Sequence, residues 1–236
     1  MASCTGSSSQ REAAPAKPPI DRKSAVTIVK KPAYVQQGAF IEDRNIQRGI
    51  TDWFFHCYPN LDYELESTKT AEKTTVTILI KKITLTISLP ITVRIGKLGG
   101  KNTQDHENGH VQIVKQVYEN AEDVAREACE PVIGERFEGT GANKEDAVAD
   151  ASDKACQQVC KLYREKTVDV GNALSKNFDD ITSHGRAAIS VKEAIRLSYE
   201  KYKRAQMKWF TKAKIDALIL LTPDRYRSAK LRPRFR

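Results

Sequence analysis

The sequence of 236 residues lacks any run of 18 apolar residues, so it predicts no membrane-spanning helix. Residues 1–22 also lack the apolar core of a signal peptide and are rich in Ser, Ala and Pro. Because that composition buries too little apolar surface to fold, we expect residues 1–22 to form a disordered tail.

The five cysteines lack C-x-x-C spacing, which argues against a zinc knuckle or a redox motif of the thioredoxin kind. Cys156 and Cys160 are one helical turn apart. In an oxidising compartment, either of them could form a disulfide with Cys129 across two packed helices. The alternative is a set of buried free thiols.

Acidic side chains are scarce at the C-terminal end. Residues 201–236 hold 12 Lys and Arg against Asp216 and Asp224, whereas residues 1–200 hold 27 basic and 28 acidic side chains. The net charge of +9 is therefore a property of the C-terminal segment. It favours contact with an anionic polymer or a membrane surface, and the alternative is a solvated helix face with a loose basic end.

Alternating apolar patterns predict that the strands come first along the chain. Val26–Lys30 is β-prone, and the strongest signal runs from Thr74 to Ile95. The apolar parity changes at Lys81-Lys82, which predicts a bulge or a turn there. Pro90 cannot donate a hydrogen bond to a sheet, so we expect this part of the strand to form a sheet edge where an extended peptide could add.

Three helical patterns follow the strands. The first begins at Asn102, a favourable N-cap, carries one apolar stripe as far as Ala128 and stops at Pro131. The second begins near Asn143 and has a candidate break at Gly171.

The second pattern ends at residues 182–185, where Gly185 is a natural terminator, and the third covers about residues 191–220. Strands followed by helices predict an α+β fold. The predicted organisation is one domain over residues 23–221, with a sheet part 23–98, a helical part 99–221 and then a basic tail 222–236.

His106-Glu107-Asn108-Gly109-His110 form an H-E-x-x-H motif within the first predicted helix. Residues four apart share a helix face, so two imidazoles can reach one zinc ion at about 2.0–2.1 Å. Glu107, about 100° round the helix, can act as general base towards a water activated by the ion. The alternative is a pair of core histidines beside a surface glutamate. A glycine inside a helix costs about 1 kcal/mol relative to alanine, so Gly109 indicates close packing beside the site.

A catalytic zinc usually has three protein ligands and one open position. Gln116 stands where the extended motif would place its third histidine. His184 is the preferred candidate, because an antiparallel helix pair could bring the end of the second helical pattern back to the motif. The other candidates are His56 and the acidic pair Glu145 and Asp146.

The motif and the later segment Phe178-Asp179-Asp180-Ile181-Thr182-Ser183-His184-Gly185-Arg186 together resemble a family of bacterial, usually secreted, zinc-dependent proteases. In that family an H-E-Q-G-H motif precedes an aromatic-Asp and T-x-H-G block, and Asn108 here replaces the usual Gln. The likeness covers roughly residues 60–205. It implies a zincin-like fold, His184 as third ligand and an envelope or extracellular setting, and it implies no particular substrate.

We therefore predict a zinc metalloprotease, secreted or periplasmic, that hydrolyses peptide bonds of a peptide or protein substrate. The predicted metal ligands are His106, His110 and His184, and the predicted catalytic groups are Glu107 and Arg186. Arg186 would stabilise the oxyanion, with Tyr199 and Tyr202 as alternatives.

Two other functions stay open. A toxin, effector or cell-wall amide hydrolase could use the same zinc site, with the basic segment bound to an anionic wall or membrane. A non-catalytic nucleic-acid-binding protein would use the cations and aromatic residues after Lys201, but no known signature supports it, and nucleic acid is not an expected partner. Because no signal peptide is visible, a cytoplasmic location is the alternative to secretion.

Overall fold

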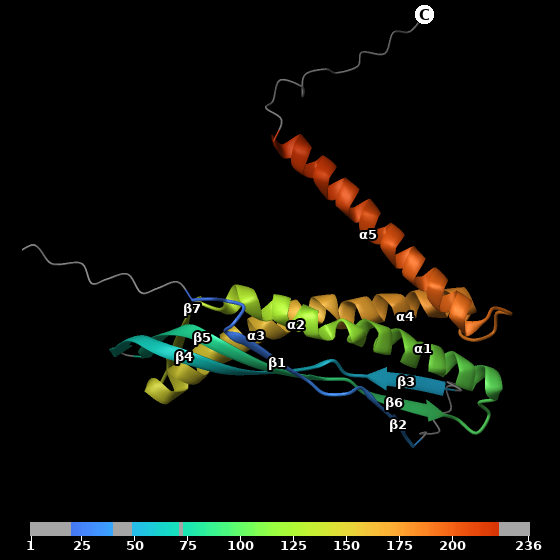
Figure 1. Ribbon diagram of the computed structural model, residues 1–236, viewed down its shortest axis with the longest axis horizontal. Helices are drawn as coiled ribbons and strands as arrows, with labels where there is room; N and C mark the ends of the chain where they lie inside the picture. The colour runs from blue at the N-terminus through green and yellow to red at the C-terminus, as the bar shows by residue number, and fades with distance from the viewer. Residues whose placement is uncertain (1–19, 40–48, 71–72, 222–236) are drawn as a thin grey trace, which may run out of the picture.

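The computed structural model describes residues 20–39, 49–70 and 73–221, and in the last helix it describes side chains as far as Met207. Of the two predicted tails, residues 1–19 and 222–236 lie outside the described residues. Strands and helices combine in layers, which confirms the α+β class (Figure 1). In chain order the elements are β1 (Val26–Lys30), β2 (Tyr34–Gln37), β3 (Gly49–Trp53), β4 (His56–Thr70), β5 (Thr74–Ser88), β6 (Pro90–Ile95), α1 (Lys101–Glu119), α2 (Ala121–Cys129), β7 (Arg136–Gly141), α3 (Lys144–Lys166), α4 (Val168–Thr182) and α5 (Val191–Leu221).

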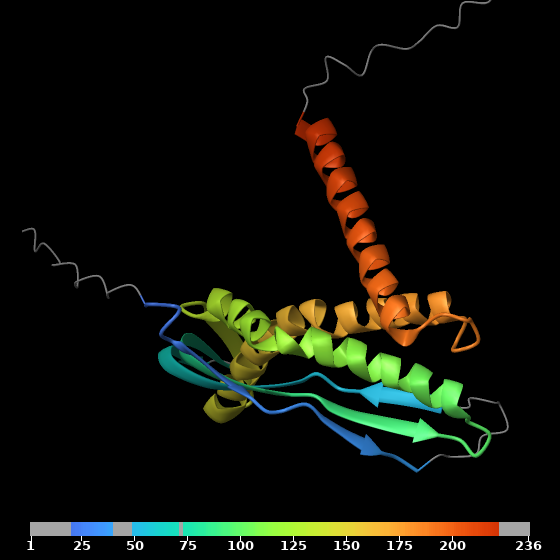
Figure 2. The same cartoon turned by 45° about the vertical axis from the view of Figure 1, so that its right-hand side comes forward.

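Two mixed sheets lie end to end and share the same three stretches of chain. The larger sheet has the order β1-β5-β4, with β7 also paired to β5, and the smaller sheet has the order β2-β6-β3. β1 and β2 run parallel to β5 and β6, whereas β3, β4 and β7 run antiparallel to their partners. α1, α2 and α3 pack on the strands, α4 packs on α1, and α5 projects away from the layers in both views (Figures 1 and 2).

The long strand β5 confirms the bulge predicted from its change of apolar parity. Asp62 of β4 pairs with Lys82, and Tyr63 pairs with Ile80, so Lys81 is the extra residue. The extra residue shifts the alternation of side chains by one position. Apolar side chains after the bulge therefore point to the same face of the sheet as those before it. The apolar residues on both sides of the bulge consequently face the helices and are buried, namely Val76, Ile78, Ile80, Ile83, Leu85 and Ile87.

The sheet edge next to the first helix is a different strand from the one predicted. β6 lies between β2 and β3 in the smaller sheet, so the stretch that begins with Pro90 is central rather than an edge. A proline is tolerated there because it is the first residue of β6, at the junction of the two sheets. Within the described residues, β3 is the edge strand that faces α1.

The first helical pattern forms two helices rather than one. Asn120, with φ −91° and ψ 6°, leaves helical geometry between α1 and α2. α1 begins at Lys101 after Gly100, and no side chain caps it, so the prediction of Asn102 as N-cap is wrong. The loss of a capping bond is compensated by packing, because one face of α1 is buried from His106 to Tyr118.

The second helical pattern breaks at Thr167, four residues before the predicted break at Gly171. Thr167 is fully buried, and its hydroxyl donates a hydrogen bond to the Tyr163 carbonyl oxygen at 2.8 Å. A local bond of this kind competes with continued helix. Gly171 lies inside α4 and packs near Phe55.

β7 was not predicted, and it places a strand inside the expected helical part. Its glycines lower its β propensity, but they allow the start of α3 to approach closely. A Cβ atom on Gly139 would lie 2.0 Å from the Ala147 carbonyl oxygen, and one on Gly141 would lie 2.5 Å from the Ala147 nitrogen. Packing of α3 therefore selects glycine in this strand.

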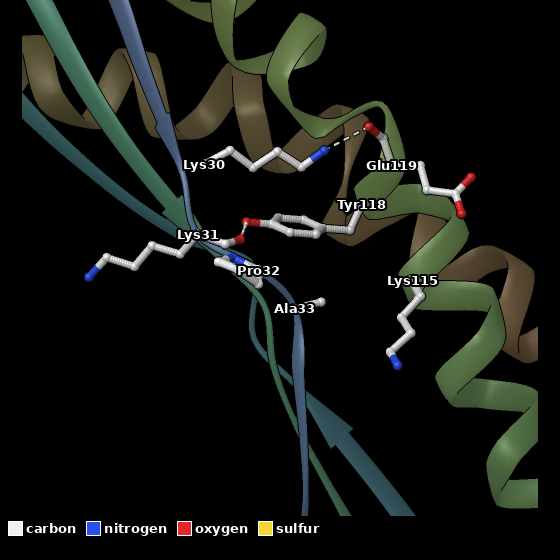
Figure 3. Close-up of a pocket in the computed structure, with 7 residues that line it drawn as sticks. All are labelled: Lys30, Lys31, Pro32, Ala33, Lys115, Tyr118 and Glu119. Atoms are coloured by element: carbon white, nitrogen blue, oxygen red, sulfur yellow. Dashed lines mark hydrogen bonds between the residues drawn. The ribbon is translucent and has the colours of Figure 1, made fainter.

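Tyr118 fastens the end of α1 to the junction between the sheets (Figure 3). Its hydroxyl donates to the Lys31 carbonyl oxygen at 2.7 Å and lies 3.2 Å from that of Ile87. Burial raises the pKa of Tyr118 to about 12, so the hydroxyl stays a donor. Lys30 Nζ, 5.1 Å from the centre of the Tyr118 ring, donates to the Glu119 carbonyl oxygen, where the helix dipole favours a cation.

A disulfide joins Cys57 of β4 to Cys160 of α3. A disulfide of Cys129 with Cys156 or Cys160 is therefore wrong, and the alternative of free thiols holds for Cys129, which is buried, and for Cys156, which is half-buried. Cys57 pairs in register with the buried Ile87 and so faces the helix layer. No helix within the described part of the chain has both the length and the apolar character to cross a bilayer.

We predict that Cys160→Ser will lower the free energy of unfolding by about 2–5 kcal/mol, because the disulfide closes a long loop in the unfolded chain. Its two cysteines are 103 residues apart in sequence. Urea unfolding under non-reducing conditions measures the change. Cys156→Ser is the matched control on the same helix and should change stability little. Equal stability of the Cys160→Ser variant and the wild type would contradict the prediction.

Candidate metal centre

A cavity of about 900 Å³ lies where α1, α4 and the edge strand β3 meet. The motif residues His106, Glu107 and His110 lie on one wall of the cavity, and the end of α4 lies on the other. The residues that line it are Gly49, Ile50, Thr51 and Trp53 of β3, Asn102, Thr103, His106, Glu107 and His110 of α1, Ser175 and Asp179 of α4, and His184, Gly185 and Arg186 after α4.

Three side chains converge on one point in this cavity. The Nε2 atoms of His106 and His110 lie 3.3 Å apart, and each lies 3.1 Å from Oδ1 of Asp179. Both histidines are buried, and Asp179 is half-buried. The helical spacing of four explains the two imidazoles, and the antiparallel packing of α4 on α1 supplies the carboxylate.

The spacing of these atoms fits a tetrahedral zinc ion. Ligand atoms about 2.0–2.1 Å from a tetrahedral centre are roughly 3.3 Å from one another. Two imidazoles and one carboxylate are also a ligand set that zinc accepts at catalytic sites, with a fourth position left for water or substrate. His106, His110 and Asp179 could therefore hold such an ion with little rearrangement.

Thr182 orients the His106 ring. The Thr182 hydroxyl donates to the Phe178 carbonyl oxygen at 2.8 Å and lies 3.3 Å from Nδ1 of His106. Since that hydroxyl proton is already used, the hydrogen-bond network assigns a proton to His106 Nδ1. The lone pair of Nε2 then points at the shared position, which is the tautomer that a metal ligand needs.

Phe178 holds both imidazoles in place, and Gly109 makes room for it. The Phe178 ring stacks on His106 at 5.0 Å and meets His110 edge-on at 5.2 Å between ring centres. A Cβ atom on Gly109 would lie 2.3 Å from Phe178 Cζ. The close packing that the mid-helix glycine predicted is thus confirmed.

Asp179 is ready to act as an anionic ligand. Burial by itself would raise the pKa of the Asp179 carboxyl, but the contacts with the His106 and His110 imidazoles hold it well below its usual range. The carboxylate therefore stays ionised at neutral pH. Nδ1 of His110 and Oγ of Ser175 are buried and have no hydrogen-bond partner within the described residues.

Glu107 is fixed by the edge strand. The Thr51 hydroxyl lies 2.7 Å from Oε2 of Glu107 and donates a hydrogen bond to it. Glu107 is buried, and a Cβ atom on Gly49 would lie 2.8 Å from its Oε1 atom. A glycine at position 49 and a hydroxyl two residues later therefore hold the carboxylate against β3, in the wall of the cavity.

His184 reaches the same cavity but lies farther from the shared point. Its Nδ1 atom is 3.6 Å from Oδ1 of Asp179, and 71% of its side chain is exposed. Ser183 and His184 have φ of 49° and 54°, so the chain leaves α4 through a left-handed turn. His184 as third ligand stays a prediction, and Asp179 is now the candidate with the better position.

The remaining predicted residues are divided between the cavity and other parts of the fold. Arg186 lines the cavity, and its Nε donates to the Ser183 carbonyl oxygen at 3.0 Å. His56 contacts Ser88 Oγ on the larger sheet. Tyr199 and Tyr202 pack instead in the cluster between α4 and α5.

The acidic candidates Glu145 and Asp146 lie in the first turn of α3, and Asp146 packs on β7. Asp179, Thr51 and Thr182 were missed as site residues. Asp179 carried the only sequence signal, as the acidic residue of the aromatic-Asp block. Thr51 and Thr182 carried no sequence signal, because their contacts with Glu107 and His106 arise only when strand β3 and helix α4 pack against α1.

Comparison with known proteins adds no family assignment: no family model, no curated protein and no solved structure matches this chain.

We predict that Asp179→Ala will abolish stoichiometric zinc binding, whereas His184→Ala will keep it. Loss of a direct ligand should weaken affinity by more than the about 10–100-fold typical of a supporting residue. Competition with a chromophoric chelator measures the affinity, and circular dichroism confirms that each variant is folded. Wild-type affinity in Asp179→Ala, together with loss in His184→Ala, would restore His184 as the third ligand.

We predict that Gly109→Ala will destabilise the protein by about 1–3 kcal/mol despite the higher helix propensity of alanine, because it displaces Phe178. The matched control is Gly171→Ala in α4, where the new Cβ atom would be 3.6 Å from its nearest neighbour in Phe55. That variant should be neutral or more stable by up to about 1 kcal/mol. Urea unfolding of both variants gives the comparison, and equal effects would show that Phe178 does not need the space.

Proposed function

We propose that the protein is a zinc-dependent peptidase whose ion is held by His106, His110 and Asp179, with Glu107 as general base. One observation carries the proposal. A buried carboxylate on the residue after His106 is held in the wall of a cavity that also contains a compact His-His-Asp group. A histidine pair with a purely structural role does not require a carboxylate held in one position beside an open cavity.

Each residue has a distinct task. Zinc, when bound, would polarise a carbonyl and lower the pKa of a water towards about 7. Glu107 accepts the proton of the attacking water, and Thr51 keeps the Glu107 carboxylate in one orientation. Arg186 offers a cation in the same cavity for the developing oxyanion. Trp53 also lines the cavity, and its ring stacks on that of His110 at 6.2 Å between ring centres.

The edge strand supports a peptide as substrate. Gly49, Ile50 and Thr51 of β3 line the cavity, and the backbone of β3 pairs with β6 on its other side. An extended peptide could therefore add to β3 by main-chain hydrogen bonds and place a peptide bond near the ligand group. This arrangement of an edge strand beside the motif helix is also the basis on which we propose a zincin-like fold.

The disulfide supports an envelope or extracellular location. Cys57 and Cys160 are joined across the core, and such bonds persist in oxidising compartments and are rare in the cytosol. The likeness of the motif and the later Thr182-Ser183-His184-Gly185 block to usually secreted proteases supports the same location.

We predict that Glu107→Gln will keep zinc and lose peptidase activity by about 10²–10⁴-fold, because glutamine cannot accept the proton from water. Glu122→Gln, an exposed change of the same kind in α2, is the control and should leave the rate unchanged. Hydrolysis of a fluorogenic peptide mixture and of unfolded casein gives the rates, and elemental analysis gives the metal content. Zinc-loaded Glu107→Gln protein with the wild-type rate would overturn the proposal.

A further inference from the structure

Two buried polar atoms beside the ligand group have no protein partner. Nδ1 of His110 and Oγ of Ser175 are both closed to solvent, and neither makes a hydrogen bond within the part of the chain that the structure describes. Both residues line the same cavity, and Ser175 is only 5% exposed. Buried polar groups without a partner are destabilising and are rare in folded proteins, so two of them in one cavity indicate a shared role.

The packing of α4 on α1 places Ser175 on the His110 side of the site. Thr182 of α4 contacts His106, and Phe178, one turn earlier in α4, contacts both His106 and His110. Earlier residues of α4 therefore meet later residues of α1, and the two helices lie side by side in both views (Figures 1 and 2). Ser175 stands three residues before Phe178 on the same helix face, which brings it towards His110.

The other neighbours of the His110 ring are poor acceptors for a proton on Nδ1. Trp53 stacks on the ring at 6.2 Å, and Phe178 meets it edge-on at 5.2 Å between ring centres. Oδ1 of Asp179 contacts the other ring nitrogen, Nε2. The hydroxyl of Ser175 has two lone pairs and no competing bond among the described residues, so it is the acceptor that this wall of the cavity offers to Nδ1.

A metal ion at Nε2 would require the proton of His110 on Nδ1. A neutral imidazole carries one proton, and the nitrogen that binds the metal must be free of it. Metal-bound histidines almost always donate the other N–H to an oxygen, which fixes the ring orientation. For His106 that place is taken by Thr182, whose hydroxyl lies 3.3 Å from Nδ1.

We infer that Ser175 is the positioning residue of His110, as Thr182 is of His106. Its hydroxyl accepts a hydrogen bond from Nδ1 of His110, directly or through one ordered water, and so presents Nε2 to the ion in a single tautomer. The inference rests on the proposed zinc site and gives Ser175 a role that needs no contact with substrate. Two hydroxyls of α4, one on each side of Asp179, then hold the two imidazoles.

The zinc affinity of the full-length protein tests this inference. Ser175→Ala should bind zinc about 10–100-fold more weakly than the wild type, which is the usual effect of removing such a partner. Ser175→Thr keeps the hydroxyl and should retain most of the affinity. Competition with a chromophoric chelator measures the affinity, and circular dichroism confirms that each variant is folded. With Co²⁺ in place of zinc, the visible absorption bands should shift in Ser175→Ala, because the His110 ring is no longer held in one orientation.

The matched control is Ser198→Ala. Ser198 is also buried in a helix, but its hydroxyl donates to the Ala194 carbonyl oxygen at 2.7 Å and it does not line the cavity. That variant should keep the zinc affinity and the Co²⁺ spectrum of the wild type. Equal zinc affinity in Ser175→Ala and the wild type, equal losses in the two alanine variants, or a loss in Ser175→Thr as large as in Ser175→Ala would overturn the inference and leave the proposed function standing. A wild-type protein that binds no zinc would overturn both.

Discussion

The contact between Gly109 and Phe178 is the constraint on which the candidate site depends. With no side chain at Gly109, α4 can bring an aromatic ring against α1 between the two imidazoles. The ring fixes the orientation of both histidines, and the next residue along α4, Asp179, then reaches the point that they share. A bulkier residue at 109 would push α4 outward and with it the carboxylate. The geometry of the ligand group is therefore a consequence of helix packing more than of the histidine spacing alone.

The base is positioned from the opposite side, by the sheet. The chain crosses from the larger sheet to the smaller one at a junction that Tyr118 fastens to the end of α1. The same crossing leaves β3 as the edge beside the motif, where Thr51 bonds to Glu107 and Gly49 leaves room for it. The two histidines and Glu107 thus come from α1 and Asp179 from α4. The ligand group is held by the packing of these helices and Glu107 by the sheet, which fixes the distance between ligands and base.

Charge is distributed unevenly between the two ends of the molecule. Residues 1–202 hold 28 basic and 28 acidic side chains, and the half-buried Asp179 carboxylate among them contacts His106 and His110. Residues 203–236 carry the excess of cations, with eleven Lys and Arg against two Asp.

The sequence by itself determined the α+β class, the bulge at Lys81, the third helix from Val191, and the two imidazoles and carboxylate of the H-E-x-x-H motif, because each is a local or periodic property of the chain. Helix breaks at Asn120 and Thr167, the strand β7, the Cys57–Cys160 pair and the central place of Pro90 were decided only in three dimensions. The same holds for Asp179: His184 had the more telling sequence signature, but the left-handed turn after Thr182 leaves it exposed while the last turns of α4 face α1. Contacts between residues far apart in the sequence determine which candidate lies beside the two histidines, and local sequence patterns do not contain that information.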